Sequence, residues 1–161
     1  TMTKRLLVTL GVAVLIGLAG GAYTLISSSE TAREVTFRGE PITAARLQTG
    51  KQLFAASCAS CHGENLEGQP DWRRRLENGR MPAPPHNEEG HTWHHSDRDL
   101  FTITQLGVEG VVENYESDMP AFEGILSEAE IVAILAYIKS TWPEQQAEFQ
   151  SVVTANDAGG S

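Results

Sequence analysis

Residues 50–68 read "GKQLFAASCASCHGENLEG", and the five residues from Cys58 to His62 at their centre decide the fold. The pattern C-x-x-C-H is typical of covalent haem attachment. Two thiols three positions apart on a tight turn can each add to one vinyl group of a haem. The next residue, His62, then lies under the porphyrin as an iron ligand. The stretch predicts one haem c, held by Cys58 and Cys61 and ligated by His62.

A bare C-x-x-C pair has two other interpretations. A thioredoxin-like dithiol would need a βαβ pattern, and no stretch of the sequence is rich in strand signals. Half of a structural zinc site would need a second pair of ligands, which only the histidines at 86–95 could supply. The chain has two cysteines in all, so there is no disulfide framework. The histidine directly after Cys61 favours haem.

The N-terminal segment, residues 1–26, predicts a transmembrane anchor. Lys4 and Arg5 precede an uncharged apolar run at 6–26, and about 20 such residues cross the hydrocarbon core as a helix. The positive charges place the N-terminus in the cytoplasm and the remaining chain across the membrane. A cleaved signal peptide, with small residues at 19–22 as the cleavage site, is the alternative. Both interpretations export the remaining chain.

Composition divides the exported part into three segments. Residues 27–42 are polar, lack a helical apolar stripe and predict a flexible tether. Residues 43–142 predict the folded domain, and residues 143–161 a mobile tail with little to bury. The net charge is −9, and no acidic residue precedes Glu30. Such an acidic domain repels phosphates, which excludes nucleic acid as a partner, and it favours partners with a basic face.

Apolar periodicity predicts an all-α domain. One helix is expected from about residue 43 to 57 and another from 96 to 106. A third helix begins at Ser127, which forms a capping box with Glu130, and stops before Pro143.

Three stretches of this sequence together resemble the class I cytochromes c over residues 43–142. They are residues 50–68, "SDMPAF" at 117–122 and "LSEAEIVAILAYIKS" at 126–140. The resemblance implies a few helices wrapped around one covalently bound haem. It also implies that Gly50 and Phe54 cross against Ile134 and Tyr137.

The resemblance further implies that Met119 is the sixth iron ligand. Met81 also precedes a proline and is the alternative, but it comes only 19 positions after His62, whereas Met119 comes 57 after. The chain must travel round the haem to its opposite face, and the longer path favours Met119. Ligation by His and Met raises the reduction potential and fills both axial positions. That predicts an electron carrier and not an enzyme.

The remaining four histidines all lie within "HNEEGHTWHH", at 86–95. We expect Trp93 and His91 to lie beside the haem, because a buried propionate needs hydrogen-bond donors. Arg80, from the basic cluster at 73–80, is a third candidate for the propionates. A second metal site and simple surface histidines are the alternatives for this cluster.

These expectations combine into one function. The chain is predicted to be a periplasmic electron carrier, tethered by a single N-terminal span to a bacterial inner membrane. It would shuttle electrons between a quinol-oxidising complex and a terminal oxidase or photosynthetic centre. The alternatives are a haem subunit fixed within a larger complex and a haem sensor or peroxidase-like protein, which requires an open iron position.

Overall fold

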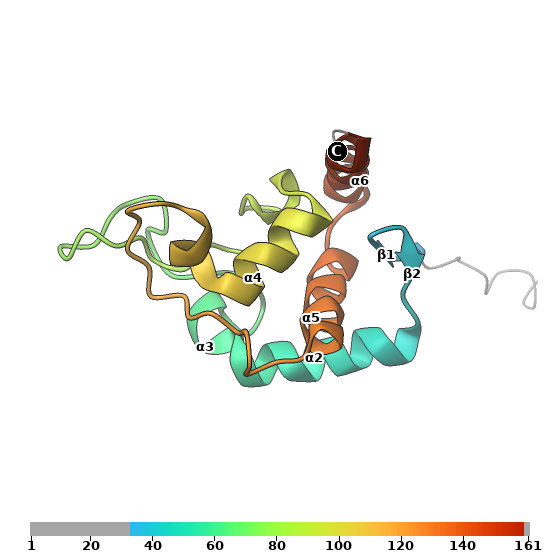
Figure 1. Cartoon of the computed structure of the whole chain (residues 1–161), viewed down its shortest axis with the longest axis horizontal. Helices are drawn as coiled ribbons and strands as arrows, with labels where there is room; N and C mark the ends of the chain where they lie inside the picture. The colour runs from blue at the N-terminus through green and yellow to red at the C-terminus, as the bar shows by residue number, and fades with distance from the viewer. Residues whose placement is uncertain (1–32, 160–161) are drawn as a thin grey trace, which may run out of the picture. The chain divides into compact units, whose positions relative to one another are not determined.

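Two crossing helices, α2 (Ala44–Ser57) and α5 (Glu128–Ser140), pack more extensively on each other than any other pair of described elements (Figure 1). A Cβ on Gly50 would lie 1.9 Å from the carbonyl oxygen of Ala133, so the missing side chain lets the two backbones approach. One turn later, the ring centroid of Phe54 lies 5.7 Å from that of Tyr137. The predicted crossing is confirmed, with Ala133 as the residue that Gly50 contacts most closely.

The computed structural model describes residues 33–159. The predicted anchor at 1–26 and residues 27–32 of the predicted tether lie outside this range. Within it, no helix is both long enough and apolar enough to cross a membrane.

The described chain is mostly helical, as predicted. Besides α2 and α5, its elements are β1 (Thr36–Phe37), β2 (Glu40–Pro41), α3 (Ala59–His62), the 3₁₀ helix η1 (Thr92–His94), α4 (Asp97–Val111) and α6 (Glu144–Gly159). The predicted capping box is present, since the Ser127 side chain accepts from the Glu130 amide and the Glu130 carboxylate accepts from the Ser127 amide. Helix α4 is broken one residue after the predicted end at 106, because Gly107 (φ 71°) is not helical; a further short helical segment then runs to Val111.

Residues 33–42 differ from the predicted flexible tether. Strands β1 and β2 pair antiparallel, with Phe37 opposite Glu40. Arg38 and Gly39 form the turn with positive φ angles of 52° and 82°, as in a two-residue hairpin. Val35 and Phe37 are 7% and 2% exposed, so their burial holds the hairpin on the domain. Each strand has only two residues, which is too few to show an alternating apolar pattern in the sequence.

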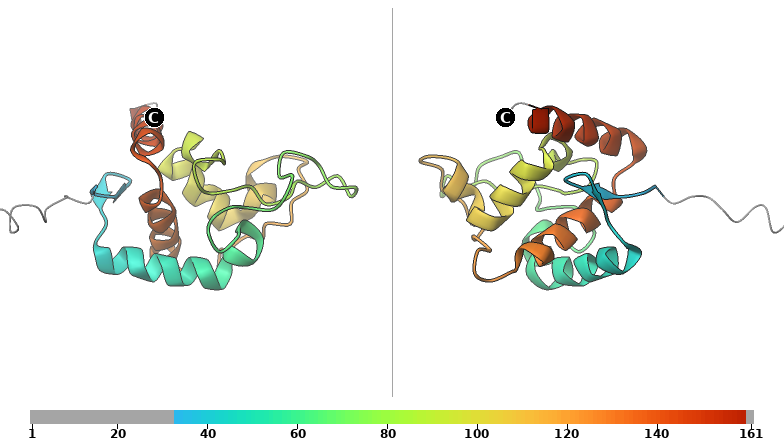
Figure 2. Two further views of the ribbon diagram at one scale, coloured as in Figure 1. Left: turned by 180° about the vertical axis from the view of Figure 1, so that it is seen from behind. Right: turned by 45° about the vertical axis from the view of Figure 1, so that its right-hand side comes forward.

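Residues 144–159 differ from the predicted mobile tail, because they form α6. This helix lies at the opposite side of the domain from α2, with α5 between them (Figures 1 and 2). Its buried residue is polar: Gln150 is 1% exposed and donates to Asp97 and to the carbonyl oxygen of His95. Hydrophobic periodicity cannot reveal a helix held in this way.

Candidate haem site

The C-x-x-C-H motif folds as a single helical turn. Cys58 ends α2 and begins α3, and its carbonyl oxygen accepts from the amides of Cys61 (3.1 Å) and His62 (3.0 Å). This turn brings the two thiols and the imidazole to one place. Burial, followed by the neighbouring Cys61, raises the pKa of the Cys58 thiol to about 11. Cys61 is exposed.

The orientation of the His62 ring is determined by a carbonyl 22 residues away. Its Nδ1 lies 2.9 Å from the oxygen of Pro84, and only an N–H group can satisfy that acceptor. The other ring nitrogen, Nε2, then carries a lone pair, as a metal ligand requires. Burial also lowers the pKa of His62, which favours the neutral ring that binds metals. The role of the Pro84 carbonyl as acceptor was not predicted from the sequence.

His86 packs directly against the predicted ligand. Its ring is stacked on His62 with centroids 4.0 Å apart and planes inclined by 23°. Its Nδ1 lies 2.8 Å from the hydroxyl of buried Thr92, and its carbonyl oxygen accepts from Trp142 Nε1 at 2.7 Å. Desolvation lowers the pKa of His86 well below its ordinary value. Of the four clustered histidines, His86 is therefore the one whose ring stacks on the predicted ligand.

Met119 lies in a loop that is bound to α4. The amides of Phe122 and Glu123 donate to the carbonyl oxygen of Gln105, at 3.0 and 2.9 Å. A Cβ on Gly107 would lie 3.2 Å from the Met119 carbonyl oxygen, so this glycine allows the close approach. The Met119 side chain is half-buried and packs against the hydrophobic core.

Trp93 provides an independent test of whether these residues fit a haem. Its Nε1 is the one buried side-chain nitrogen or oxygen of the described region that has no hydrogen-bond partner. An indole N–H can only donate, and leaving it unsatisfied is costly. A haem propionate would supply the missing acceptor. The ring packs against those of His94 (centroids 3.8 Å apart) and Phe149 (5.4 Å apart), which also contact each other.

Comparison with known proteins agrees with this geometry, since residues 47–142 match the sequence profile of the cytochrome c family. The chain belongs to the cytochrome c family. Covalent haem c and electron transfer are therefore its expected cofactor and activity, as the motif predicted.

Three relatives place this cytochrome among electron-transfer proteins. The Rhodobacter capsulatus cbb3-type cytochrome c oxidase subunit CcoP is 34% identical over 103 residues, 63% of this chain and 31% of the relative. The Mycobacterium bovis cytochrome bc1 complex cytochrome c subunit is 40% identical, over 45% of this chain and 30% of the relative. Cytochrome c6 of Tetradesmus obliquus is 33% identical, over 58% of this chain and 89% of the relative. The matched segment thus spans about a third of the two larger relatives.

His91 and Arg80, the other residues expected near a propionate, have different neighbours in the cytochrome. The exposed His91 ring stacks on Trp72, with centroids 5.6 Å apart, at the side of an open cleft. Arg80 forms ion pairs with Asp118 and, at 3.7 Å, with Glu116. Their contacts with the propionates stay predictions.

The alternative of a second metal receives no support from the histidine cluster. Across residues 33–159, no three His, Cys, Asp or Glu side chains converge as metal ligands. The His86 ring stacks on His62 and its Nδ1 forms a hydrogen bond with Thr92, whereas the His94 ring stacks on Trp93.

Proposed function

We propose that this cytochrome carries single electrons between complexes of a bacterial respiratory or photosynthetic membrane, anchored there by its N-terminal apolar run. The relatives that support this are subunits of a cbb3-type oxidase and of a bc1 complex, and a cytochrome c6. The uncharged run at 6–26 supports the anchor and the periplasmic position of the domain. A tether raises the effective concentration of a carrier near its membrane partners without tight binding.

In this proposal Cys58 and Cys61 hold the haem, and His62 and Met119 ligate its iron. The haem supplies a reversible one-electron change of the iron. The protein's part is to keep the ligands in place: Pro84 orients His62, and the backbone of α4 holds the Met119 loop. The observation that carries this proposal is the hydrogen bond between His62 Nδ1 and the carbonyl oxygen of Pro84. It prepares His62, the residue directly after the second cysteine, to bind iron through Nε2.

A redox titration of the purified holoprotein with carbon monoxide present and absent tests the proposal. A carrier with both axial positions occupied should give a one-electron Nernst curve. Its reduced form should keep its absorption spectrum under carbon monoxide at neutral pH. Rapid carbon monoxide binding would instead support the sensor or peroxidase-like alternative.

The second candidate is a haem subunit fixed within a larger complex. It is favoured by the fact that the two larger relatives are subunits of complexes and are matched over only about a third of their length. Purification from native membranes in mild detergent separates the two candidates. A shuttle should elute apart from oxidase and quinol-oxidising activity, whereas a fixed subunit should accompany one of them in constant ratio.

A further inference from the structure

Two arginines of the loop between α3 and η1 reach the segment that precedes Met119. The guanidinium of Arg80 pairs with the carboxylate of Asp118, and its Nε lies 3.7 Å from an oxygen of Glu116. The guanidinium carbon of Arg75 lies 5.7 Å from the ring centroid of Tyr115. We call these five residues the arginine clamp.

The arginine side of the clamp is an ordered turn. Arg75 donates from Nη1 to the carbonyl oxygen of Gly79 at 2.7 Å, and the Leu76 amide donates to the carbonyl oxygen of Arg80 at 2.8 Å. The Arg80 amide donates to the side chain of Asn78 at 3.0 Å. Because the turn is closed by its own hydrogen bonds, the Arg80 guanidinium is presented in a defined direction.

The clamp joins the loop that carries Met119 to the loop that carries Pro84, the residue that orients His62. Arg80 lies four residues before Pro84, whose carbonyl oxygen orients His62. Asp118 is the residue directly before Met119. On the far side, the Met119 amide donates to Ser117 Oγ at 3.1 Å, and the Ser117 amide donates to Glu109 of α4 at 2.8 Å. The segment before Met119 is therefore held by α4 on one side and by Arg80 on the other.

We propose that the arginine clamp is a positioning device that keeps the Met119 thioether on the iron. This inference rests on the proposed ligation by Met119. Arg80 acts through Asp118 and contacts neither the thioether nor its backbone. When the pair opens, the loop can move away and an external ligand can take the sixth position. Exposed ion pairs weaken in salt, so the exchange should also depend on ionic strength.

Imidazole binding to the ferric holoprotein measures this exchange, followed by loss of the near-infrared sulfur–iron band. We expect Arg80→Gln and Asp118→Asn each to raise imidazole affinity by about threefold, as for loss of an exposed ion pair. The double variant should gain no more than Arg80→Gln alone, because Arg80→Gln already breaks the pair with Asp118. In 1 M NaCl the differences from wild type should shrink.

Arg74→Gln is the matched control, because it removes the same charge from the same loop. The Arg74 side chain is exposed and, in the part of the chain that the structure describes, makes no hydrogen bond or ion pair. It should bind imidazole as wild type does, and Arg80→Lys should recover part of the effect. Hydrogen exchange of the Met119 amide should be faster in Arg80→Gln than in Arg74→Gln.

Equal imidazole affinities for Arg80→Gln and Arg74→Gln, or additive effects in the double variant, would overturn the clamp and leave Met119 ligation intact. A wild-type protein without the sulfur–iron band, or a Met119→Ala variant that keeps it, would overturn the ligation and the clamp together. Electron transfer measured by redox titration would stand in either case.

Discussion

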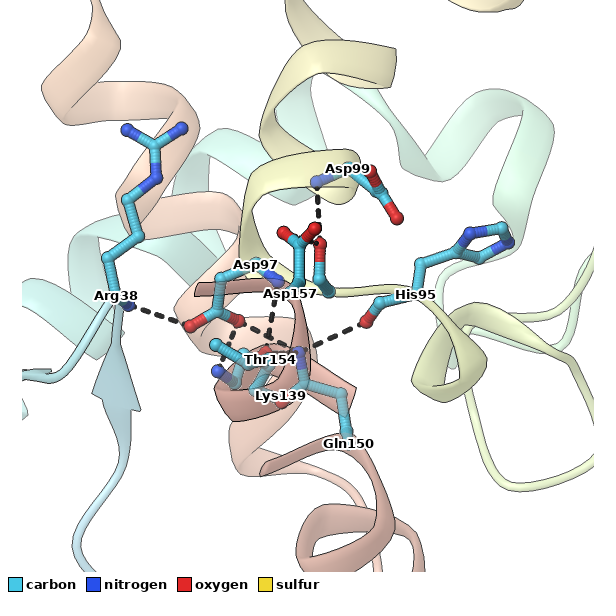
Figure 3. A network of polar contacts seen from close by, with 9 residues as sticks. Arg38, His95, Asp97, Asp99, Lys139, Gln150, Thr154 and Asp157 are labelled. Atoms are coloured by element: carbon cyan, nitrogen blue, oxygen red, sulfur yellow. Dashed lines mark hydrogen bonds and ion pairs between the residues drawn. The ribbon is translucent and has the colours of Figure 1, made fainter. Parts of the chain in front are cut away.

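The carboxylate of Asp97 and the ammonium group of Lys139 form a buried ion pair, with Oδ1 and Nζ 2.5 Å apart and side chains 2% and 11% exposed. The same carboxylate accepts from the Arg38 amide at 2.7 Å and from Gln150 Nε2 at 2.9 Å (Figure 3). One acidic group therefore joins the hairpin, α4, α5 and α6. The hairpin and α6 lie outside the matched residues 47–142, and this network connects them to the family's domain.

Asp97→Asn should destabilise the protein by about 3–5 kcal/mol, because it leaves the buried Lys139 ammonium without its counter-charge. Guanidinium unfolding of the holoprotein measures the loss. Asp99→Asn, in the same first turn of α4 but exposed, is the control and should cost less than about 1 kcal/mol. Equal losses in the two variants would show that the buried pair contributes no more than a surface charge at the helix start.

Met119→Ala should abolish the near-infrared sulfur–iron band, whereas Met81→Ala should keep it. Met119 packs against the core in the loop bound to α4, and Met81 is not among the described side chains that pack there. Absorption spectra of the ferric proteins measure the band. The reverse pattern would assign the sixth position to Met81.

Trp93→Phe should lower the reduction potential by tens of millivolts, since about 59 mV corresponds to a tenfold shift between two one-electron states. Loss of the buried indole donor leaves a propionate charge less compensated, and that charge stabilises ferric iron. Phenylalanine preserves the ring contact with Phe149. Potentiometric titration measures the shift, with His94→Gln as a control on the exposed side of the ring. An unchanged potential would remove Trp93 from the propionate site.

The capping box predicts a pH dependence of stability. Hydrogen bonds from the side chain and then the backbone of Ser127 lower the pKa of Glu130 below its ordinary value of 4.5. A carboxyl whose pKa is lower in the folded state stabilises the fold above pH 4.5, and this contribution disappears as the pH falls through the lowered pKa. Wild type should therefore be more stable than Glu130→Gln at pH 7, with the difference narrowing below about pH 4.5. Urea unfolding across this range measures it, and a constant difference would contradict the assignment.

Local sequence patterns were enough to predict the haem attachment motif, the main helices of the domain and the capping box. Each depends on spacing along the chain: two residues lie between the cysteines, two lie between Ser127 and Glu130, and the apolar face of a helix repeats periodically. Such patterns can be recognised without knowing the fold, because residues close in sequence meet within a single helix or turn. The crossing of α2 and α5 at Gly50 joins residues far apart in the sequence, and it was expected only from the family resemblance.

The surroundings of the motif could be known only from the three-dimensional structure. His62 meets Pro84 across 22 residues, Arg80 meets Asp118 across 38, and Gln150 meets Asp97 across 53. Each of these contacts is one polar interaction between two distant residues, so it produces no repeating pattern in the sequence. For the same reason the sequence of α6 was interpreted as a mobile tail: its contacts, such as Gln150 with Asp97 and Phe149 with Trp93, join residues that meet only after the helices have packed.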